Sequence, residues 1–443
     1  MDKTELKTRK VSAFNLGCDK NRVDLEHVLY ALKEYGFQIV DNIEDAEIIF
    51  VNTCAFIAPA RKEAIDAILT AIHEKTHGRA EKVIVGGCLP QRNLEELRHA
   101  LPEVDYFLDY KNNDKIVSVI EELYDVKPTK FAPTEHKRVL TNFPHYAYLK
   151  IADGCSNACA YCAIPRIRGR FRSTPIDALV KEAKELASSG VKELIIVAQD
   201  VTRYGVDIDT NLLELLKELV KIKGIEWIRL HYLYPELVTD ELLDFIKNER
   251  KMCKYVDIPL QHIDDIVLKN MNRRTSEQQI IDLMDKLKTK YPEISIRSTF
   301  IVGFPGETRA QFKKLCNFLK KYKLDNVGFF PYFREPNTKA FFYKKQVPEF
   351  VKRKRLKKIA DLQGDIALFN NMTRIGQVHK VIVDYYDEEN KYFVARTEFC
   401  SPNVDFCVII DSGVKVGEFY NVELTDLSEL GYKGEVKWIY LIE

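Results

Sequence analysis

The stretch YAYLKIADGCSNACAYCAIP, residues 146–165, joins a strand-like run to three closely spaced cysteines. Its first seven residues are mostly apolar or aromatic, which is typical of a buried strand. Cys155, Cys159 and Cys162 follow it directly. Such a trio fits a disulfide staple, a zinc loop or the ligands of an iron–sulfur cluster, and other parts of the sequence distinguish these possibilities.

Composition and the expected location of the protein argue against a disulfide among these three cysteines. The chain has 443 residues, which predicts about three domains. Its 67 Lys and Arg balance 66 Asp and Glu, so a general polyanion binder is not indicated. The polar N-terminal segment lacks a signal-peptide core, and no apolar run reaches the roughly 20 residues of a membrane span. We therefore expect a cytoplasmic protein with no membrane partner, in which thiols stay reduced and favour metal or redox roles.

Three more cysteines end strand-like runs in the N-terminal part. KVSAFNLGC ends at Cys18, AEIIFVNTC at Cys54 and KVIVGGC at Cys88, with helix-like stretches between them. This alternation predicts an α/β domain with a doubly wound parallel sheet, whose strand ends share one edge. The three thiols should therefore gather there, although buried packing cysteines remain the alternative. Gly86 and Gly87 would let the backbone approach a bulky ligand.

From residue 8 onward the sequence divides into four segments. Residues 8–126 form the predicted N-terminal domain, and 127–140 read as a Pro- and Lys-containing linker. Residues 141–372 contain six strand–helix units and predict a partial parallel (β/α)6 barrel, with the cysteine loop at its catalytic carboxyl face. Residues 373–443 predict a small all-β barrel. The expected barrel strands are YAYLKIA, ELIIVAQD, IRLHYLY, YVDIPLQ, SIRSTFIVGF and NVGFFPYF.

Spacing favours a cluster over zinc. A structural zinc site usually has four Cys or His ligands, and no fourth ligand is visible near Cys155, Cys159 and Cys162. Three thiolates in one loop suit a four-iron cluster whose fourth iron stays open. A zinc loop or chance cysteines remain the alternative on spacing alone.

The loop resembles the C-x3-C-x2-C signature of radical S-adenosylmethionine enzymes. In that family the open iron binds the amino and carboxylate groups of S-adenosylmethionine, and the reduced cluster releases a 5′-deoxyadenosyl radical. The resemblance implies that Tyr161, the aromatic residue before the last cysteine, lies near the cofactor. IVGFPGE, residues 301–307, resembles the family's glycine motif on the adenine side, which implicates Gly303. A buried strand followed by a Pro-Gly turn is the alternative for that segment.

Across its whole length the chain resembles the methylthiotransferases within this group. NLGCDKNRVD, VNTCAFI, VIVGGCLPQR, DGCSNACAYCAIPRIRGRFRS, IPLQH and GFPGET carry the likeness, which includes a terminal TRAM barrel. It implies two [4Fe-4S] clusters. The auxiliary cluster would be held by Cys18, Cys54 and Cys88, and the radical-generating cluster by Cys155, Cys159 and Cys162. It also implies S-adenosylmethionine as methyl donor, a sulfur source and an electron donor of the flavodoxin or ferredoxin type. No catalytic side chain is assigned.

Two observations address the substrate. Asp19, Lys20 and Asn21 follow the first cysteine and resemble the branch that modifies the β-carbon of an aspartate in small-subunit ribosomal protein twelve. Residues 373–443 carry 7 Lys and Arg against 13 Asp and Glu, a net charge of −6. Such a module suits a basic protein better than RNA phosphates. The alternative is a transfer-RNA methylthiotransferase acting on an N6-modified adenosine, with a small basic face gripping the RNA.

The other candidates are less specific. Arg168, Arg170 and Arg172 follow the cysteine loop and either bind a carboxylate of cofactor or substrate or form a solvated loop. A cluster-bearing binding protein without catalysis is a second function class, which would require neither open iron. The cysteines outside both trios interrupt apolar patterns and are interpreted as packing residues: Cys253, Cys316, Cys400 and Cys407.

Overall fold

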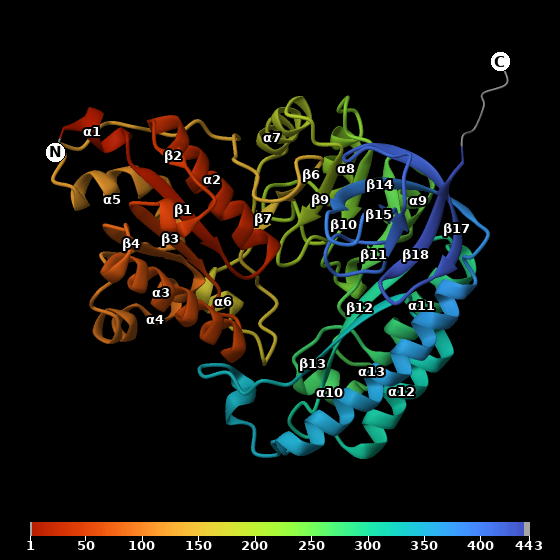
Figure 1. Cartoon of the computed structure of the whole chain (residues 1–443). Coiled ribbons are helices and arrows are strands. Elements are labelled where there is room, and N and C mark those ends of the chain that lie inside the picture. Colours follow the sequence, from red (N-terminus) through yellow and green to blue (C-terminus); the bar gives the residue numbers. More distant parts are fainter. Residues whose placement is uncertain (1, 438–443) are drawn as a thin grey trace.

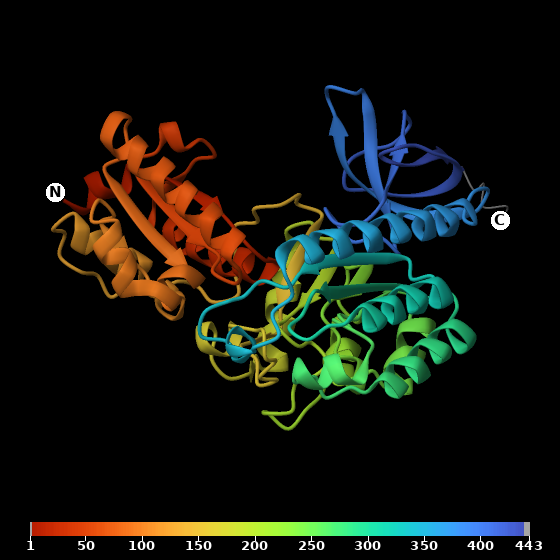
Figure 2. The ribbon, with the colours of Figure 1, turned by 90° about the horizontal axis from the view of Figure 1, so that it is seen from below.

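The computed structural model describes residues 2–437 and shows three units along the chain (Figure 1). An N-terminal α/β domain lies beside a central β/α barrel, and a small β-barrel lies over the barrel's far end. Figure 2 shows these units as three lobes, with the long helix α13 (Glu349–Met372) running beneath the small β-barrel. Within residues 2–437, no helix is long and apolar enough to cross a lipid bilayer.

The N-terminal domain is a five-stranded sheet in the order β2-β1-β3-β4-β5, with every neighbouring pair parallel. One apolar cluster fills the face under α2 and α5, and a second fills the face under α3 and α4. The predicted doubly wound sheet is therefore confirmed. Its strands are β1 (Lys10–Asn15), β2 (Gln38–Ile39), β3 (Ile48–Thr53), β4 (Lys82–Gly87) and β5 (Tyr106–Phe107). Its helices are α1 (Lys3–Lys7), α2 (Asp19–Tyr35), α3 (Ala58–His77), α4 (Cys88–Ala100) and α5 (Ile116–Leu123), with short turns η1 (Ile43–Asp45) and η2 (Tyr110–Lys115).

Residues 127–140, predicted to be a linker, pack closely against both neighbouring units. The Arg138 side chain is fully buried, and its guanidinium lies 3.4 Å from Glu26 on α2 and 3.2 Å from Glu182 on α7 (Ile176–Ser188). Phe131 and Val139 rest against the N-terminal core. The stretch therefore joins the two units through two ion pairs of Arg138, and its apolar side chains pack against the N-terminal core.

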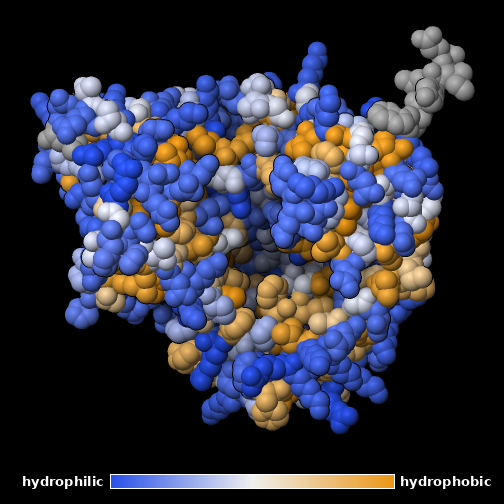
Figure 3. All heavy atoms as spheres, in the orientation of Figure 1, coloured by the Kyte–Doolittle hydropathy of each residue, from blue (hydrophilic) through white to orange (hydrophobic). Residues whose placement is uncertain are grey.

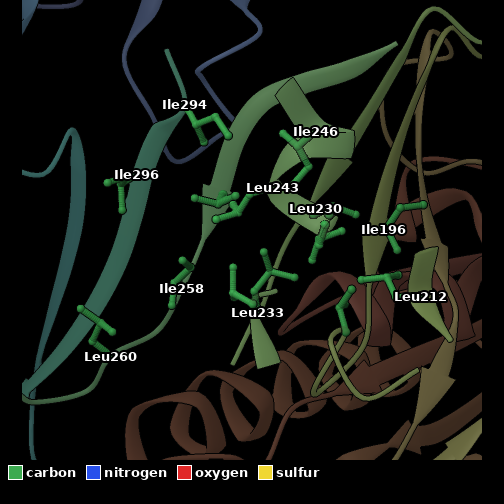
Figure 4. Close-up of a cluster of buried hydrophobic side chains, with 14 of the residues drawn as sticks. Ile196, Leu212, Leu230, Leu233, Leu243, Ile246, Ile258, Leu260, Ile294 and Ile296 are labelled. Carbon is green, nitrogen blue, oxygen red and sulfur yellow. The ribbon is translucent and has the colours of Figure 1, made fainter. Parts of the chain in front are cut away.

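The central unit is a six-stranded open parallel sheet in the order β13-β12-β11-β10-β9-β6, which matches the predicted partial barrel. Leucine and isoleucine side chains fill the space between its strands and the surrounding helices (Figure 4). Its strands are β6 (Tyr146–Lys150), β9 (Glu193–Val197), β10 (Trp227–Leu230), β11 (Met252–Asp257), β12 (Ser295–Val302) and β13 (Asn326–Pro331), with a side ribbon of β7 (Ala152–Asp153) and β8 (Arg172–Ser173). Besides α7 and α13, the helices are α6 (Ile164–Ile167), α8 (Leu212–Leu219), α9 (Asp240–Asn248), α10 (Asp265–Asn270), α11 (Glu277–Lys290) and α12 (Arg309–Tyr322), with η3 (Pro235–Leu237) and η4 (Lys339–Phe342).

The C-terminal unit is a closed five-stranded barrel in the order β14-β15-β16-β18-β17. A buried ion-pair network fixes it to the central sheet, because Glu193 of β9 lies 2.8 Å from both Arg229 and Arg396. Arg396 also pairs with Asp384, which lies 2.8 Å from His145. The strands are β14 (Val378–Asp387), β15 (Tyr392–Thr397), β16 (Cys407–Ile410), β17 (Phe419–Leu427) and β18 (Gly431–Val436). Its first two strands, β14 and β15, pair as an antiparallel hairpin, and the barrel matches the small all-β unit predicted for this end of the chain.

Candidate iron–sulfur site

Three adjacent strands of the N-terminal sheet deliver the first cysteine trio, which we call the auxiliary trio. Cys18 precedes α2 just after β1, Cys54 follows β3, and Cys88 begins α4 after β4. Because β1, β3 and β4 are neighbours in a parallel sheet, their carboxyl ends lie side by side. The topology therefore brings together three thiols that are far apart in sequence.

Gly17 makes the approach of two of these thiols possible. Its φ is +93°, a conformation that side chains disfavour, and a β-carbon placed there would lie 2.7 Å from Cβ of Cys54. Gly86 and Gly87 have a different role from the one expected. The space beside them is filled by the Phe50 ring and by the backbone of Thr53, so they permit packing of β4 on β3 and not the approach of a ligand.

The second trio, the radical trio, lies in the loop between β7 and α6. The amide of Cys155 donates to the Gly169 carbonyl at 3.1 Å, and the amide of Ala160 donates to the Met271 carbonyl at 2.9 Å. Within the loop, the amide of Ile164 donates to Sγ of Cys162 at 3.4 Å. These bonds hold the loop across the carboxyl end of the barrel and turn its thiols toward the N-terminal domain.

All six thiols line a single cavity of about 570 Å³ between the two domains. The molecular surface is hollowed between the N-terminal lobe and the rest of the molecule (Figure 3). Aliphatic and aromatic side chains from both domains, including Ile57, Ile167 and Tyr234, form much of the wall. A smaller apolar space of about 210 Å³, bordered by Ile301 and Tyr332, shares several of these wall residues.

One buried arginine lies at each trio. Arg168 at the end of α6 lies 3.3 Å from Sγ of Cys88, and its guanidinium also contacts Asp24 at 2.5 Å. Arg273 lies 3.8 Å from Sγ of Cys159 and donates to the Pro259 carbonyl at 3.1 Å. Each set of thiols therefore has a fixed positive charge at hydrogen-bond distance, as an anionic thiolate site requires.

The three arginines that follow the cysteine loop separate into two groups. Arg168 is buried away from solvent, and its guanidinium lies 4.3 Å from the centre of the Tyr110 ring. Arg170 and Arg172 are exposed. The solvated-loop interpretation fits Arg170 and Arg172, whereas the guanidinium of Arg168 contacts a thiol and a carboxylate of this chain, Asp24. Binding of a cofactor or substrate carboxylate by these arginines stays a prediction.

Burial makes these thiols poor anions unless a metal compensates. It raises the pKa of Cys88 to about 12 and also raises the pKa values of Cys54, Cys155 and Cys162. Metal binding requires deprotonated thiols. Bound iron would supply the positive charge that stabilises the thiolates, in place of the water that burial excludes. Among residues 2–437 no three His, Cys, Asp or Glu side chains converge on a point that suits a single ion. Three thiols at each trio match the ligands that cysteines supply to an iron–sulfur cluster.

The two residues implicated in cofactor binding occupy different places. Tyr161 lines the cavity, with its ring centre 6.4 Å from that of Phe304. Gly303 directly follows β12 and has a φ of +72°. Its amide donates to the Glu307 carboxylate at 2.5 Å, and the aliphatic chain of Lys352 fills the space beside it. Gly303 thus lies behind the cavity wall.

A second polar contact between the domains gave no signal in the sequence. Glu335, in the loop after β13, accepts from the amide of Ala58 at 2.7 Å at the start of α3. Its other oxygen pairs with Arg61 and lies 3.1 Å from Arg92. Its partners lie more than 240 residues away in the chain, so only the fold reveals the contact. Glu335 also borders the smaller apolar space beside the cavity.

The other four cysteines lie away from the cavity. Cys253, Cys316 and Cys400 are buried in apolar clusters, as predicted for packing residues. Cys407 is partly buried, and its thiol lies 3.1 Å from the Leu430 carbonyl.

Three family signatures match successive parts of the chain. Residues 10–109 match uncharacterized protein family UPF0004, 149–319 match the radical SAM superfamily, and 375–436 match the TRAM domain. Each cysteine trio falls within one of the first two matches.

Relatives with similar sequences cover nearly the whole chain. The ribosomal protein uS12 methylthiotransferase RimO of Pelobacter propionicus is 44% identical over 449 residues, covering 99% of each chain. The RimO proteins of Geobacter sulfurreducens and Clostridium acetobutylicum are 42% and 40% identical, and each alignment covers 96% of this chain and 98% of the relative.

Solved structures share the fold at much lower identity. The radical S-adenosylmethionine methyltransferase TsrM from Kitasatospora setae has a TM-score of 0.55 and 16% identity, over 75% of this chain and 77% of that one. The cobalamin-dependent radical enzyme OxsB has a TM-score of 0.52 and 14% identity, over 80% of this chain and 57% of that one.

Proposed function

Since this chain belongs to the RimO family of radical S-adenosylmethionine methylthiotransferases, we propose that it adds a methylthio group to the β-carbon of an aspartate in ribosomal protein uS12. One observation carries the proposal: both cysteine trios line the same cavity. A radical source and a sulfur carrier would then face one substrate carbon, and holding reacting groups together lowers the barrier to their reaction.

The family implies a [4Fe-4S] cluster and S-adenosylmethionine, and the radical trio has the chemistry to hold them. Cys155, Cys159 and Cys162 supply three thiolates, which leaves one iron for the cofactor. When bound, these groups supply a carbon radical that removes hydrogen from an unactivated C–H bond. The chain itself positions this chemistry: Arg273 offsets the thiolate charge, and the buried loop keeps water away.

The auxiliary trio fits a second [4Fe-4S] cluster. Cys18, Cys54 and Cys88 also offer three thiols and no fourth, so an iron would remain free to carry sulfide or methylsulfide. Arg168 lies beside Cys88 and offsets negative charge there. We assign the three thiols as its ligands on this basis.

The cofactor site extends toward β12. Tyr161 borders both the main cavity and the smaller apolar space, which suits a flat ring such as adenine. Gly303 acts on cofactor binding indirectly. The Glu307 carboxylate accepts hydrogen bonds from the amides of Gly303 and Phe304 and shapes the turn behind that space.

The β-barrel suits a basic protein partner. Its 13 acidic against 7 basic residues, in 373–443, disfavour phosphate binding and favour a basic ribosomal protein. The relatives carry the name of a ribosomal protein methylthiotransferase, which points the same way and against the transfer-RNA alternative. From the proposed ribosomal protein substrate we infer that the reaction takes place in the cytoplasm. Reductive cleavage also requires an electron donor of the flavodoxin or ferredoxin type, and each turnover consumes sulfur from a separate source.

Substrate competition tests the proposal directly. The chain, reconstituted anaerobically with iron and sulfide, is given S-adenosylmethionine, a reductant and either isolated uS12 or unmodified transfer RNA. We expect a methylthio mass gain on one aspartate of uS12 and none on the RNA, with Cys18→Ala as the inactive control. A mass gain on the RNA alone would contradict the proposal.

A further inference from the structure

Lys20 has an unusual environment in the cavity. It lies two residues after Cys18 on the first turn of α2, lines the cavity and is only 7% exposed. Within residues 2–437 its ammonium makes no hydrogen bond or ion pair to protein atoms. Its recorded contact is with the face of the Tyr232 ring, 3.5 Å from the ring centre. A buried charge without a paired anion is costly, so its retention calls for a ligand.

The other cavity cations differ in this respect. Arg168 contacts Asp24 and a thiol, and Arg273 contacts a thiol and a backbone carbonyl. Their positive charge is already directed at protein groups. Three cations line the cavity: Lys20, Arg168 and Arg273. Among the described residues that line it, Lys20 is the cation whose N–H donors are free for a bound anion.

The Tyr232 platform under Lys20 is itself held in place. Tyr232 has a φ of +58°, which is uncommon for a bulky residue and persists only where the surrounding structure imposes it. Its hydroxyl donates to Asp19 at 3.1 Å, and its amide donates to Asp257 at 3.2 Å. Both nearby carboxylates are thus engaged by Tyr232, and neither forms an ion pair with Lys20 in the described structure.

We propose that Lys20 binds the carboxylate of the substrate aspartate and thereby selects an acidic side chain as the target. The inference rests on the proposed function and deepens it. An aspartate carboxylate is bonded directly to the β-carbon, so a cation that fixes the carboxylate also fixes the reacting carbon. Lys20 extends from the helix that begins beside Cys18, and it therefore places that carbon on the sulfur-carrying side of the cavity.

S-adenosylmethionine also has a carboxylate, and the same ammonium chemistry would bind it. The position of Lys20 favours the substrate, because Lys20 and Tyr232 adjoin the auxiliary trio through Cys18 and Asp19. The radical trio and Tyr161 belong to the barrel loop, where the cofactor is expected. An experiment with separate binding measurements for protein substrate and cofactor distinguishes the two sources.

The test uses the full chain, reconstituted as holoenzyme, with uS12 carrying either Asp or Asn at the modified position. Wild type should bind the Asp form more tightly. Lys20→Gln should weaken binding of the Asp form roughly 10- to 100-fold and leave the Asn form nearly unchanged, because a hydrogen bond to a charged group contributes about 1.5–3 kcal/mol. Lys20→Arg should retain part of the discrimination. Lys33→Gln, at an exposed position on the same helix, is the matched control.

Iron content and the dissociation constant of S-adenosylmethionine are measured on the same samples. Full iron and unchanged cofactor binding, together with lost Asp-over-Asn discrimination, support the assignment. Retained discrimination in Lys20→Gln overturns it, as does weaker cofactor binding or lost iron without a change in discrimination. If wild type binds and modifies uS12 but Lys20→Gln behaves identically, only this inference fails. If wild type neither binds nor modifies uS12, the proposed function fails first.

Discussion

The auxiliary and radical trios present the same number of thiols to one cavity but are assembled in opposite ways. The radical trio comes from one short loop after a single strand, whereas the auxiliary trio comes from three strand ends spread from Cys18 to Cys88. The loop can hold its geometry through local hydrogen bonds. The auxiliary trio depends on the register of β1, β3 and β4 and on the close approach that Gly17 allows.

The two buried arginines that contact the trios also differ, in whether arginine and thiol belong to the same domain. Arg273 and the thiol of Cys159 both belong to the central barrel, so the radical trio and its cation form within one domain. Arg168 belongs to the barrel but contacts Cys88 and Asp24 of the N-terminal domain. The auxiliary site is therefore complete only when the two domains dock. This difference predicts that distant changes damage the auxiliary site more readily than the radical site.

The largest effect is expected for the radical trio. Alanine at Cys155, Cys159 or Cys162 should abolish cleavage of S-adenosylmethionine, because thiolates are the only cluster ligands proposed. Iron per chain should fall by about half, since the auxiliary trio remains intact. Deoxyadenosine formation and iron content, measured after reconstitution, check both expectations. A variant that still forms deoxyadenosine at the wild-type rate would show that the loop does not hold the radical-generating cluster.

Alanine at Cys18, Cys54 or Cys88 should separate the two activities. Iron should again fall by about half, but deoxyadenosine should still form while no methylthio product appears. The reason is that the radical site is contained within the barrel. Product masses and iron content after reconstitution provide the measurement. Full iron in any of these variants would contradict the auxiliary assignment.

Replacing Arg168 should damage the auxiliary site selectively. Arg168→Met leaves Asp24 with Lys150 alone and removes the charge beside Cys88, so we expect a loss of about 3 kcal/mol in unfolding free energy. Auxiliary iron should bind roughly 10- to 100-fold more weakly. Urea unfolding of the apo chain and iron titration measure the two effects.

Arg170→Met is the matched control, since Arg170 lies in the same loop but is exposed, and we expect a change within about 0.5 kcal/mol. Equal iron affinity in the Arg168 and Arg170 variants would remove the proposed role of the cross-domain arginine.

The smallest effect concerns Gly17. Gly17→Ala introduces a β-carbon in a left-handed conformation, which costs about 1–2 kcal/mol, and also displaces Cys54. Gly190→Ala makes a matched comparison, because its φ of +101° carries a similar backbone cost while no atom lies within 4 Å of the new carbon. Both variants should lose stability through the backbone cost, Gly17→Ala should lose more because its new carbon also crowds Cys54, and only Gly17→Ala should lose auxiliary iron. Loss of iron in both, or in neither, would show that crowding at Cys54 is not decisive.

The same contrast explains what the sequence could predict. The radical trio can be read from the sequence because its ligands lie within one loop. The barrel strands can be predicted because buried apolar runs such as β6 and β9 recur between helical stretches, although β13 is only partly buried. The auxiliary trio could be grouped only through the topology of parallel sheets. The edge strands β2 and β5, with two residues each, and the four-residue β16 are too short to show a pattern.

The remaining features depend on contacts across the fold. Arg138 lies in a stretch that reads as a linker, yet its partners are on α2 and α7. Glu335, in the loop after β13, contacts residues on α3 and α4 of the N-terminal domain, far away in sequence. The motif that contains Lys20 is visible in the sequence. Its burial, and the absence of an acceptor for its ammonium among residues 2–437, are visible only in the folded cavity.

The central claim is that two clusters face one cavity, and electron paramagnetic resonance of the fully reduced holoenzyme tests it most directly. Paramagnetic clusters on opposite walls of a cavity of about 570 Å³ should couple magnetically. We predict a wild-type spectrum broadened relative to the sum of the spectra of Cys18→Ala and Cys155→Ala, each of which retains one cluster. A wild-type spectrum equal to that sum, at full iron content, would contradict the account.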